Sequence, residues 1–232
     1  MFEGLRIGVV VPAFNEEQSI ASVVEHIPAC VDDIVVVDNG STDQTAERSR
    51  HSGATVLHES RRGYGFACLK GIDYLQQCGS DVIVFLDGDF SDHPEDLPDL
   101  LQPIVTDGYD LVIGSRMLGK RQPGALLPQA IAGNWLASTL IRMFWGQRFT
   151  DLGPFRAIRT DALKRLKMSD PTYGWTVEMQ IKAAKLKMRC TEVPVRYRKR
   201  IGRSKVTGTL SGTIKASAKI LFTIFKYLFV KV

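Results

Sequence analysis

The chain has 232 residues, of which 44% are hydrophobic and 24% are charged, and its formal net charge at pH 7 is +5. These values fit one globular domain with a short extension, and they exclude a disordered or low-complexity protein. The charge is uneven, because residues 185–205 hold nine basic side chains and one acidic side chain, which predicts an anionic ligand or surface near the C-terminal third. No nucleic-acid recognition motif accompanies this stretch, so we expect no nucleic-acid partner.

Cysteine spacing and apolar length limit where the protein is expected to work. The cysteines form no CxxC pair and indicate reduced thiols in a cytosolic setting. The first residues lead into a strand pattern without the features of a signal peptide, and no apolar run reaches the roughly twenty residues of a membrane span. We therefore expect a protein that is neither secreted nor integral to a membrane.

Short apolar segments alternate with helical patterns through the first half of the chain. The segments are rich in Val, Ile and Leu without clean alternation, which is typical of strands covered on both faces. Asn15 with Gln18 and Ser41 with Gln44 have capping-box spacing, which predicts helix starts. Strand–helix alternation predicts an α/β fold with a mostly parallel central sheet flanked by helices, and ligands at the carboxyl ends of its strands. The predicted strands are residues 7–11, 33–37, 54–57, 82–86 and 111–113.

The pattern changes after Arg116. A loop with Gly and Pro comes first, and helical and extended segments then follow without a repeat or a linker, so the second half is expected to supply another face of the same domain. The helical patterns cover residues 128–145 and 174–187, and the extended ones cover residues 151–158 and 189–197.

Two carboxylates directly follow the fourth predicted strand, in the sequence Asp87-Gly88-Asp89. At the end of a buried strand they can share one divalent cation, since Mg²⁺ or Mn²⁺ prefers oxygen ligands and completes its shell with phosphates and water. A pair of solvated turn carboxylates is the alternative. The strand placement, with Ser91 close behind, favours the metal site.

Polar residues also follow the first two predicted strands, at residues 12–17 and 38–43. Glu16 has an ordinary explanation, because acidic side chains stabilise helix starts. Asp38 is not needed for capping, and a carboxylate there can accept hydrogen bonds from a base or a ribose. The basic glycine turn at residues 61–65 lacks Walker-type spacing, so an ATPase or a dinucleotide fold is not expected.

These three strand ends, in this order, resemble glycosyltransferase family 2, whose strands end in P-x-x-N-E, D-[DN]-x-S-x-D and D-x-D. The resemblance continues through residues 114–116, 150–156 and 202–205, so it spans nearly the whole chain. It is closest to the dolichyl-phosphate mannosyltransferase and related polyprenyl-phosphate branch. It implies a GT-A-type nucleotide-diphospho-sugar transferase fold, an inverting single displacement and an Mg²⁺ or Mn²⁺ cofactor. The implied donor is a nucleotide-diphospho-sugar of the GDP-mannose or UDP-glucose type, and the implied acceptor is a polyprenyl phosphate.

The same resemblance implies roles for single residues. Asp87, Asp89 and Ser91 would surround the metal, and Asp89, Asp151 and Glu178 are the expected catalytic residues. Apart from the resemblance, Asp151 and Glu178 are candidates for a general base, and the alternatives are a turn carboxylate and a helix-face ion pair. The expected donor-binding residues are Pro12, Phe14, Glu16, Val37, Asp38, Asp87, Gly88, Arg116, Lys199, Arg200, Arg203 and Lys205.

The basic loop has its own interpretation. If the strand before it continues, alternation places Arg196, Arg198 and Arg200 on one face. A solvated basic edge that discourages strand pairing is the alternative. A binding surface for a diphosphate and a phosphate acceptor is favoured, because guanidinium groups bind phosphate oxygens well.

The last segment separates lysines from apolar residues. Lys215, Lys219 and Lys226 fall on one helical stripe, opposite an apolar face. Packing on the protein's own core is one possibility, and binding to a bilayer interface with anionic lipid is the favoured one. We expect a glycosyltransferase domain over residues 1–209 and an amphipathic membrane-interface helix over residues 210–232, attached peripherally to the cytoplasmic face of a membrane. The apolar face comprises Ile220, Leu221, Ile224, Phe225 and Leu228.

Together these features predict a metal-dependent glycosyltransferase. A polyprenyl phosphate acceptor is ionised near pH 7 and needs no strong base, whereas a hydroxyl acceptor would need Asp151 or Glu178. The alternatives are transfer to a hydroxyl of a glycolipid or polysaccharide, a catalytically silent nucleotide-sugar binder, and a nucleotidyltransferase. A homo-oligomer or a membrane-protein partner is left open.

Overall fold

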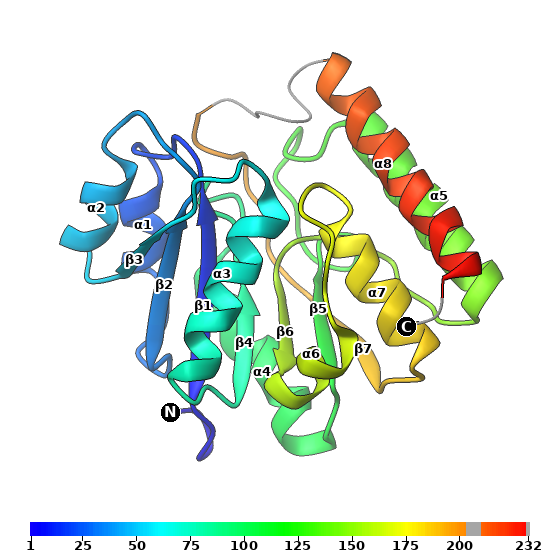
Figure 1. Ribbon diagram of the computed structural model, residues 1–232, viewed down its shortest axis with the longest axis horizontal. Coiled ribbons are helices and arrows are strands. Elements are labelled where there is room, and N and C mark those ends of the chain that lie inside the picture. Colours follow the sequence, from blue (N-terminus) through cyan, green and yellow to red (C-terminus); the bar gives the residue numbers. More distant parts are fainter. Residues whose placement is uncertain (203–209, 231–232) are drawn as a thin grey trace.

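The computed structural model describes residues 1–202 and 210–230, and a seven-stranded sheet lies at its centre (Figure 1). The strand order is β3-β2-β1-β4-β6-β5-β7, and all neighbouring pairs are parallel except those of β6, which runs antiparallel to β4 and β5. The predicted mostly parallel sheet is confirmed. The strands are β1 Ile7–Ala13, β2 Asp33–Asp38, β3 Thr55–His58, β4 Val82–Phe85, β5 Leu111–Ser115, β6 Arg156–Arg159 and β7 Cys190–Pro194.

Helices cover both faces of the sheet, because successive strand residues point to opposite sides. Val10 and Val35 belong to one buried cluster with residues of α3, α6 and α7, whereas Val9 and Val36 belong to another with residues of α1 and α4. The result is a three-layer arrangement with its core on either side of the strands. The helices are α1 Ile20–Glu25, α2 Thr45–His51, α3 Tyr64–Gln77, α4 Leu97–Asp107, α5 Pro128–Trp145, α6 Thr160–Leu166, α7 Trp175–Lys185 and α8 Leu210–Phe229, with a 3₁₀ turn at Pro94–Asp96.

The two predicted capping boxes are wrong. α1 begins at Ile20 and α2 at Thr45, each several residues later than the spacing predicts. The polar side chains bond across the two loops instead: the Asn15 amide donates to Ser41 Oγ at 2.9 Å, and the Thr42 amide donates to Asn15 Oδ1 at 2.8 Å. These bonds hold the loops that follow β1 and β2 side by side.

The C-terminal helix packs on the domain and also exposes an apolar side. α8 lies along α5 and contacts α7 (Figure 1). Ile224 and Tyr227 are buried in the same cluster as residues of α5 and α7, whereas Phe225 and Leu228 are exposed. The predicted apolar face is therefore divided between the core and the surface. The division of the chain at residues 209 and 210 stays a prediction.

Among the described helices, none has the length and apolar character needed to cross a membrane.

Candidate active site

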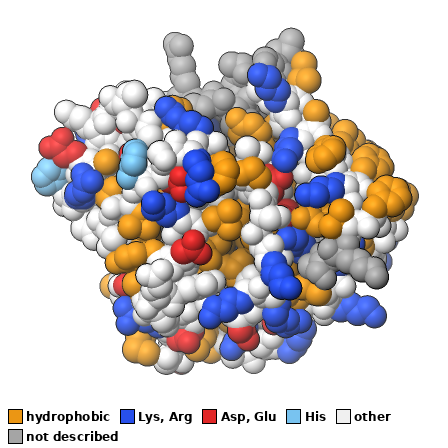
Figure 2. Space-filling model, in the orientation of Figure 1, with side chains coloured by type: hydrophobic (Ala, Val, Ile, Leu, Met, Phe, Trp, Pro, Cys, Tyr) orange, Lys and Arg blue, Asp and Glu red, His pale blue; other side chains and the backbone are white. Residues whose placement is uncertain are grey.

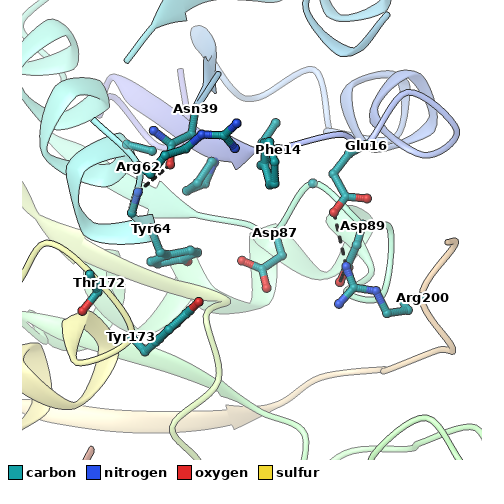
Figure 3. Close-up of a pocket in the computed structure, with 15 residues that line it drawn as sticks. Phe14, Glu16, Asn39, Arg62, Tyr64, Asp87, Asp89, Thr172, Tyr173 and Arg200 are labelled. Atoms are coloured by element: carbon teal, nitrogen blue, oxygen red, sulfur yellow. Dashed lines mark hydrogen bonds and ion pairs between the residues drawn. The ribbon is translucent and has the colours of Figure 1, made fainter. Parts of the chain in front are cut away.

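A pocket of about 560 Å³ opens where β1, β2 and β4 end (Figure 3). It brings together several residues that the sequence assigned to donor or metal, from loops far apart in the chain. Two further stretches, the turn before α3 and the loop before α7, complete its wall. The lining residues are Pro12, Ala13, Phe14, Glu16, Asn39, Arg62, Gly63, Tyr64, Ala67, Asp87, Gly88, Asp89, Thr172, Tyr173 and Arg200.

Asp87 and Asp89 form the acidic part of this pocket. Arg200 Nη2 lies 3.2 Å from Asp89 Oδ2 and 3.2 Å from Glu16 Oε1, so one guanidinium joins two carboxylates (Figure 3). Asp87 Oδ1 is buried and has no hydrogen-bond partner among the described residues. Burial and the charge of Asp89 raise the pKa of Asp87 to about 7. Within the described residues, one oxygen of this acidic pair is thus left without a hydrogen-bond donor.

These oxygens fit a hard divalent cation. A carboxylate oxygen that is buried without a partner, next to a second carboxylate, is stabilised by an ion such as Mg²⁺ or Mn²⁺. Within residues 1–202 and 210–230 no group of three or more His, Cys, Asp or Glu side chains is arranged to hold a metal. The remaining ligands would therefore come from a diphosphate and water.

Ser91 orients Asp89. Its amide and its hydroxyl both donate to Asp89 Oδ1, at 2.9 Å and 2.5 Å. The hydroxyl hydrogen is thus directed at a carboxylate, which fixes the other oxygen of Asp89 toward Arg200. The expected role of Ser91 as a metal ligand stays a prediction.

The turn before α3 forms a wall that the sequence analysis did not assign. Asn39, at the end of β2, donates to Glu59 O and Arg61 O at 3.0 Å and 2.7 Å and accepts from the Gly63 amide at 2.8 Å. The turn fixed in this way places the Arg62 guanidinium over the Phe14 ring, 3.9 Å from its centre. The signal in the sequence was the basic glycine turn at residues 61–65, to which no site was assigned because it lacks Walker-type spacing.

Comparison with known proteins agrees with this geometry. The family model described as Glycosyl transferase family 2 matches residues 8–167. The chain belongs to glycosyltransferase family 2.

Similar proteins cover nearly the whole of this glycosyltransferase. The undecaprenyl-phosphate mannosyltransferase of Micrococcus luteus is 32% identical over 225 residues, which cover 90% of each chain. The UDP-N-acetylglucosamine–dolichyl-phosphate N-acetylglucosaminyltransferase of Methanococcus voltae is 29% identical over 212 residues, covering 82% of this chain and 84% of its own.

A solved structure confirms the predicted fold. Glucosyl-3-phosphoglycerate synthase from Mycobacterium tuberculosis, in complex with Mn²⁺, uridine diphosphate and glucosyl-3-phosphoglycerate, superposes with a TM-score of 0.76 at 27% identity, covering 99% of this chain and 82% of the synthase.

Two expected donor residues of the glycosyltransferase at β2 lie beside the pocket and are not among its lining residues. Val37 is fully buried in the sheet. Asp38 accepts from the Ser41 amide at 2.9 Å, and its Oδ2 lies 3.2 Å from His58 Nδ1. Their role in donor binding stays a prediction.

Arg116 and Asp151 bind each other in this glycosyltransferase. The Arg116 side chain donates to both oxygens of Asp151 at 2.7 Å, and its amide donates to Asp151 Oδ2 at 2.8 Å. Burial acts to raise the pKa of Asp151, but the charge and hydrogen bonds of Arg116 outweigh it and hold this pKa below its ordinary value. A carboxylate so engaged is a weak base. Arg116 is not among the residues that line the pocket, and its role in donor binding stays a prediction.

Glu178 is enclosed between α7, α8 and the loop before α7. It accepts from Tyr227 Oη at 2.6 Å, from Ser169 Oγ at 2.7 Å and from the Asp170 amide at 2.7 Å, and it lies 2.9 Å from Lys182 Nζ. Burial acts to raise the pKa of Glu178, but these partners lower it below its ordinary value. The side chain is fully buried and lies outside the pocket lining. Its expected role as a base stays a prediction.

The strand does not continue into the basic loop, and the three arginines contact the segment after β4 at different points. β7 ends at Pro194, so strand alternation does not extend to the loop. Arg196 Nε donates to Asp96 at 2.7 Å, and Arg198 stacks on the Phe90 ring at 3.6 Å. Only Arg200, of these three, reaches the pocket.

The other predicted donor-binding residues of the basic loop are Lys199, Arg203 and Lys205. The amide of Lys199 donates to Gln122 Oε1 at 3.0 Å, and its exposed side chain lies near Gly124. Arg203 and Lys205 lie outside the described residues. The proposed donor contacts of these three residues stay predictions.

Asp92 is a third carboxylate that the sequence analysis passed over. It is buried beside Tyr197, and neither of its oxygens has a hydrogen-bond partner among the described residues. Burial and the charge of Asp87 raise its pKa well above the ordinary value. Its position three residues after Asp89 was the signal that could have identified it.

Proposed function

We propose that this glycosyltransferase moves a sugar from a nucleotide-diphospho-sugar to a polyprenyl phosphate at a membrane surface. The observation that carries the choice of acceptor is the state of the two expected bases. All oxygens of Asp151 and Glu178 are occupied by hydrogen bonds or ion pairs. A hydroxyl acceptor needs a base, whereas a phosphate oxygen is ionised near pH 7 and attacks without one.

The donor is expected to bind over Asp87 and Asp89. These two carboxylates would hold Mg²⁺ or Mn²⁺, and a bound ion of this kind neutralises the charge that develops on a departing diphosphate. The Mn²⁺ and uridine diphosphate bound by the mycobacterial synthase support this assignment. Arg200 would exchange part of its contact with Glu16 and Asp89 for a phosphate oxygen of the donor.

The named relatives support a lipid-linked acceptor. Those from Micrococcus luteus and Methanococcus voltae act on undecaprenyl phosphate and dolichyl phosphate by their names. The mycobacterial synthase, which shares the fold, is named for glucosyl-3-phosphoglycerate instead. The fold alone therefore does not identify the acceptor. Because the oxygens of Asp151 and Glu178 are occupied by hydrogen bonds and ion pairs, an acceptor that is already ionised is favoured.

Helices α5 and α8 support attachment to a lipid surface. Trp135 and Met143 of α5 are 68% and 64% exposed, and Phe222 and Phe229 of α8 are 61% and 88% exposed. Neither helix contains an acidic residue, and both carry basic ones. Figure 2 shows hydrophobic and basic side chains together along the edge where these helices lie. A second copy would bring like charges together, whereas anionic lipid complements them.

Sugar transfer from radiolabelled donors tests the function directly. GDP-mannose, UDP-glucose and UDP-N-acetylglucosamine are each supplied with Mn²⁺ and either polyprenyl phosphate or a glycolipid with free hydroxyls. We expect a lipid-phosphate product that EDTA abolishes and Mn²⁺ restores. Transfer to the hydroxyl acceptor alone would establish the alternative function, and binding without transfer to any acceptor would identify a silent nucleotide-sugar binder.

Vesicle sedimentation tests the membrane surface. Replacing Phe222 and Phe229 by Ser should reduce binding to phosphatidylglycerol vesicles by about tenfold or more, because each Phe contributes about 1.5–3 kcal/mol when fully buried. Phosphatidylcholine vesicles serve as the uncharged control and should bind the wild type less. Equal binding by the wild type and the double variant would show that these helices do not contact lipid.

A further inference from the structure

One wall of the pocket comes from the loop between α6 and α7. Thr172 and Tyr173 of this loop line the pocket beside Tyr64 (Figure 3). The loop is far in sequence from the strand ends that provide the carboxylates. Whatever fixes it therefore fixes the shape of the pocket.

The loop touches the neighbouring wall, formed by the turn before α3, backbone to backbone. The Phe66 amide donates to Pro171 O at 3.3 Å. A Cβ on Gly63 would lie 2.2 Å from Pro171 O, and one on Gly65 would lie 1.9 Å from Asp170 O. Such close approach is possible only for glycine. A shift of this loop would therefore move the turn that carries Arg62.

α8 holds this loop through an ion pair. Lys219 Nζ lies 2.8 Å from Asp170 Oδ2, and the Asp170 side chain is only 9% exposed, so solvent screens the pair weakly. The other oxygen, Asp170 Oδ1, accepts from the Thr172 amide at 2.8 Å. One carboxylate therefore connects a lysine of α8 to a residue of the pocket wall.

A second connection runs through Glu178. Tyr227 Oη of α8 donates to Glu178 Oε1 at 2.6 Å, and the Asp170 amide donates to Glu178 Oε2 at 2.7 Å. The two connections are separated by two turns of α8 and meet at the same loop residue. They hold both the backbone and the side chain of Asp170.

We propose that α8 sets the position of the pocket wall, and that Lys219 and Tyr227 are positioning residues for nucleotide-sugar binding. The inference rests on the proposed function only in taking the pocket to bind a nucleotide diphosphate; it does not involve the acceptor. Lys219 belongs to the lysine stripe that is predicted to face anionic lipid, but its ammonium group pairs with Asp170 of the same chain.

Calorimetric titration of the full chain with UDP and with GDP, each with Mn²⁺, tests the proposal. Lys219→Met and Tyr227→Phe should raise the Kd of the bound nucleotide by about fivefold or more, since displaced binding groups lose much of their effect. Lys219→Arg should restore most of the affinity. Lys215→Met, which removes an exposed charge one turn earlier on α8, is the matched control and should leave Kd unchanged.

The outcomes separate this proposal from the proposed function. Variants that melt like the wild type and bind with the wild-type Kd would overturn the positioning role. A wild type that binds a nucleotide but transfers no sugar would overturn the proposed function and leave the positioning role supported by the Kd values. A wild type that binds neither nucleotide would overturn both. In an active enzyme the donor KM should rise with Kd while kcat is kept, which loss of folded protein would not produce.

Discussion

The carboxylates of Asp87 and Asp89, which follow β4, differ in their hydrogen-bond partners from those of Asp151 and Glu178 in the second half of the chain. Asp87 faces the pocket with one buried oxygen unpartnered, and its neighbour Asp89 shares a single arginine with Glu16. Asp151 and Glu178 are more deeply buried than Asp87, but every oxygen is hydrogen-bonded or paired. Buried charge without a partner lowers stability and is retained where a ligand uses it, whereas paired charge holds loops in place. The difference separates residues expected to act on substrate from residues that support them.

The largest expected effect is on activity. Asp89→Asn should reduce sugar transfer by ~10³-fold or more, because it removes charge that would hold the metal on the diphosphate. Its melting temperature should stay close to that of the wild type, since the substitution also relieves repulsion with Asp87. Transfer assays and thermal melting of the same preparation measure the two effects. Full activity in EDTA would contradict the metal assignment.

Asp151→Asn should reduce stability more than it reduces sugar transfer. Breaking its pair with Arg116 leaves a buried guanidinium uncompensated, which should cost about 3–5 kcal/mol of unfolding free energy. Turnover of the folded fraction should stay within about tenfold of the wild type, because loss of a general base would cost ~10²–10⁴-fold. Denaturant unfolding and transfer assays below the melting range measure both. A folded variant with normal stability and orders of magnitude less transfer would make Asp151 a base.

The pH dependence of the metal-free protein sharpens the comparison. Asp87 has a pKa of about 7 when folded, above its ordinary value of 3.8, so the folded state holds this proton more tightly. Its contribution to stability should therefore fall as pH rises from about 4 to 7, and then level off. In EDTA, the melting temperature of Asp87→Asn should gain on that of the wild type over this range. Parallel curves for the two proteins would contradict the raised pKa.

The smallest expected effect concerns the pocket wall. Arg62→Ala removes a guanidinium stacked 3.9 Å from the Phe14 ring. A stack of this kind contributes about 0.5–1 kcal/mol, so donor KM should rise only a few-fold. Arg61→Ala is the matched control, because Arg61 stacks on Phe66 at 4.4 Å and lies outside the pocket lining. An equal change in KM for both variants would show that the effect is general charge loss.

The sequence predicts the β1, β2 and β4 strand ends well because their signal is local. A buried strand followed by polar residues places Pro12, Glu16 and Asp89 at one edge of the sheet, and the structure brings these residues into one pocket. Thr172 and Tyr173 carry no comparable pattern, since a loop between two helices reaches the pocket only through tertiary contacts.

The second half of the chain shows why residue type alone predicts less. Asp151 and Glu178 look like bases until Arg116 and Tyr227, distant in sequence, are seen to bind them. The arginines after β7 were assigned by alternation, which holds only while the strand continues. Such partners are fixed by packing, which periodicity does not report.

The antiparallel strand β6 has a consequence for the order of assembly. β6 joins β4 to β5, and without it the sheet consists of the group β3-β2-β1-β4 and the pair β5-β7. Its partners lie far back in the chain, since Ile158 pairs with both Ile83 and Leu111. Contacts of such separation form slowly, because a long loop must close first. During synthesis the strands whose ends form the pocket emerge first and can pair among themselves. β5 joins them only when β6 has been made, and β7, which is made last, then pairs with β5.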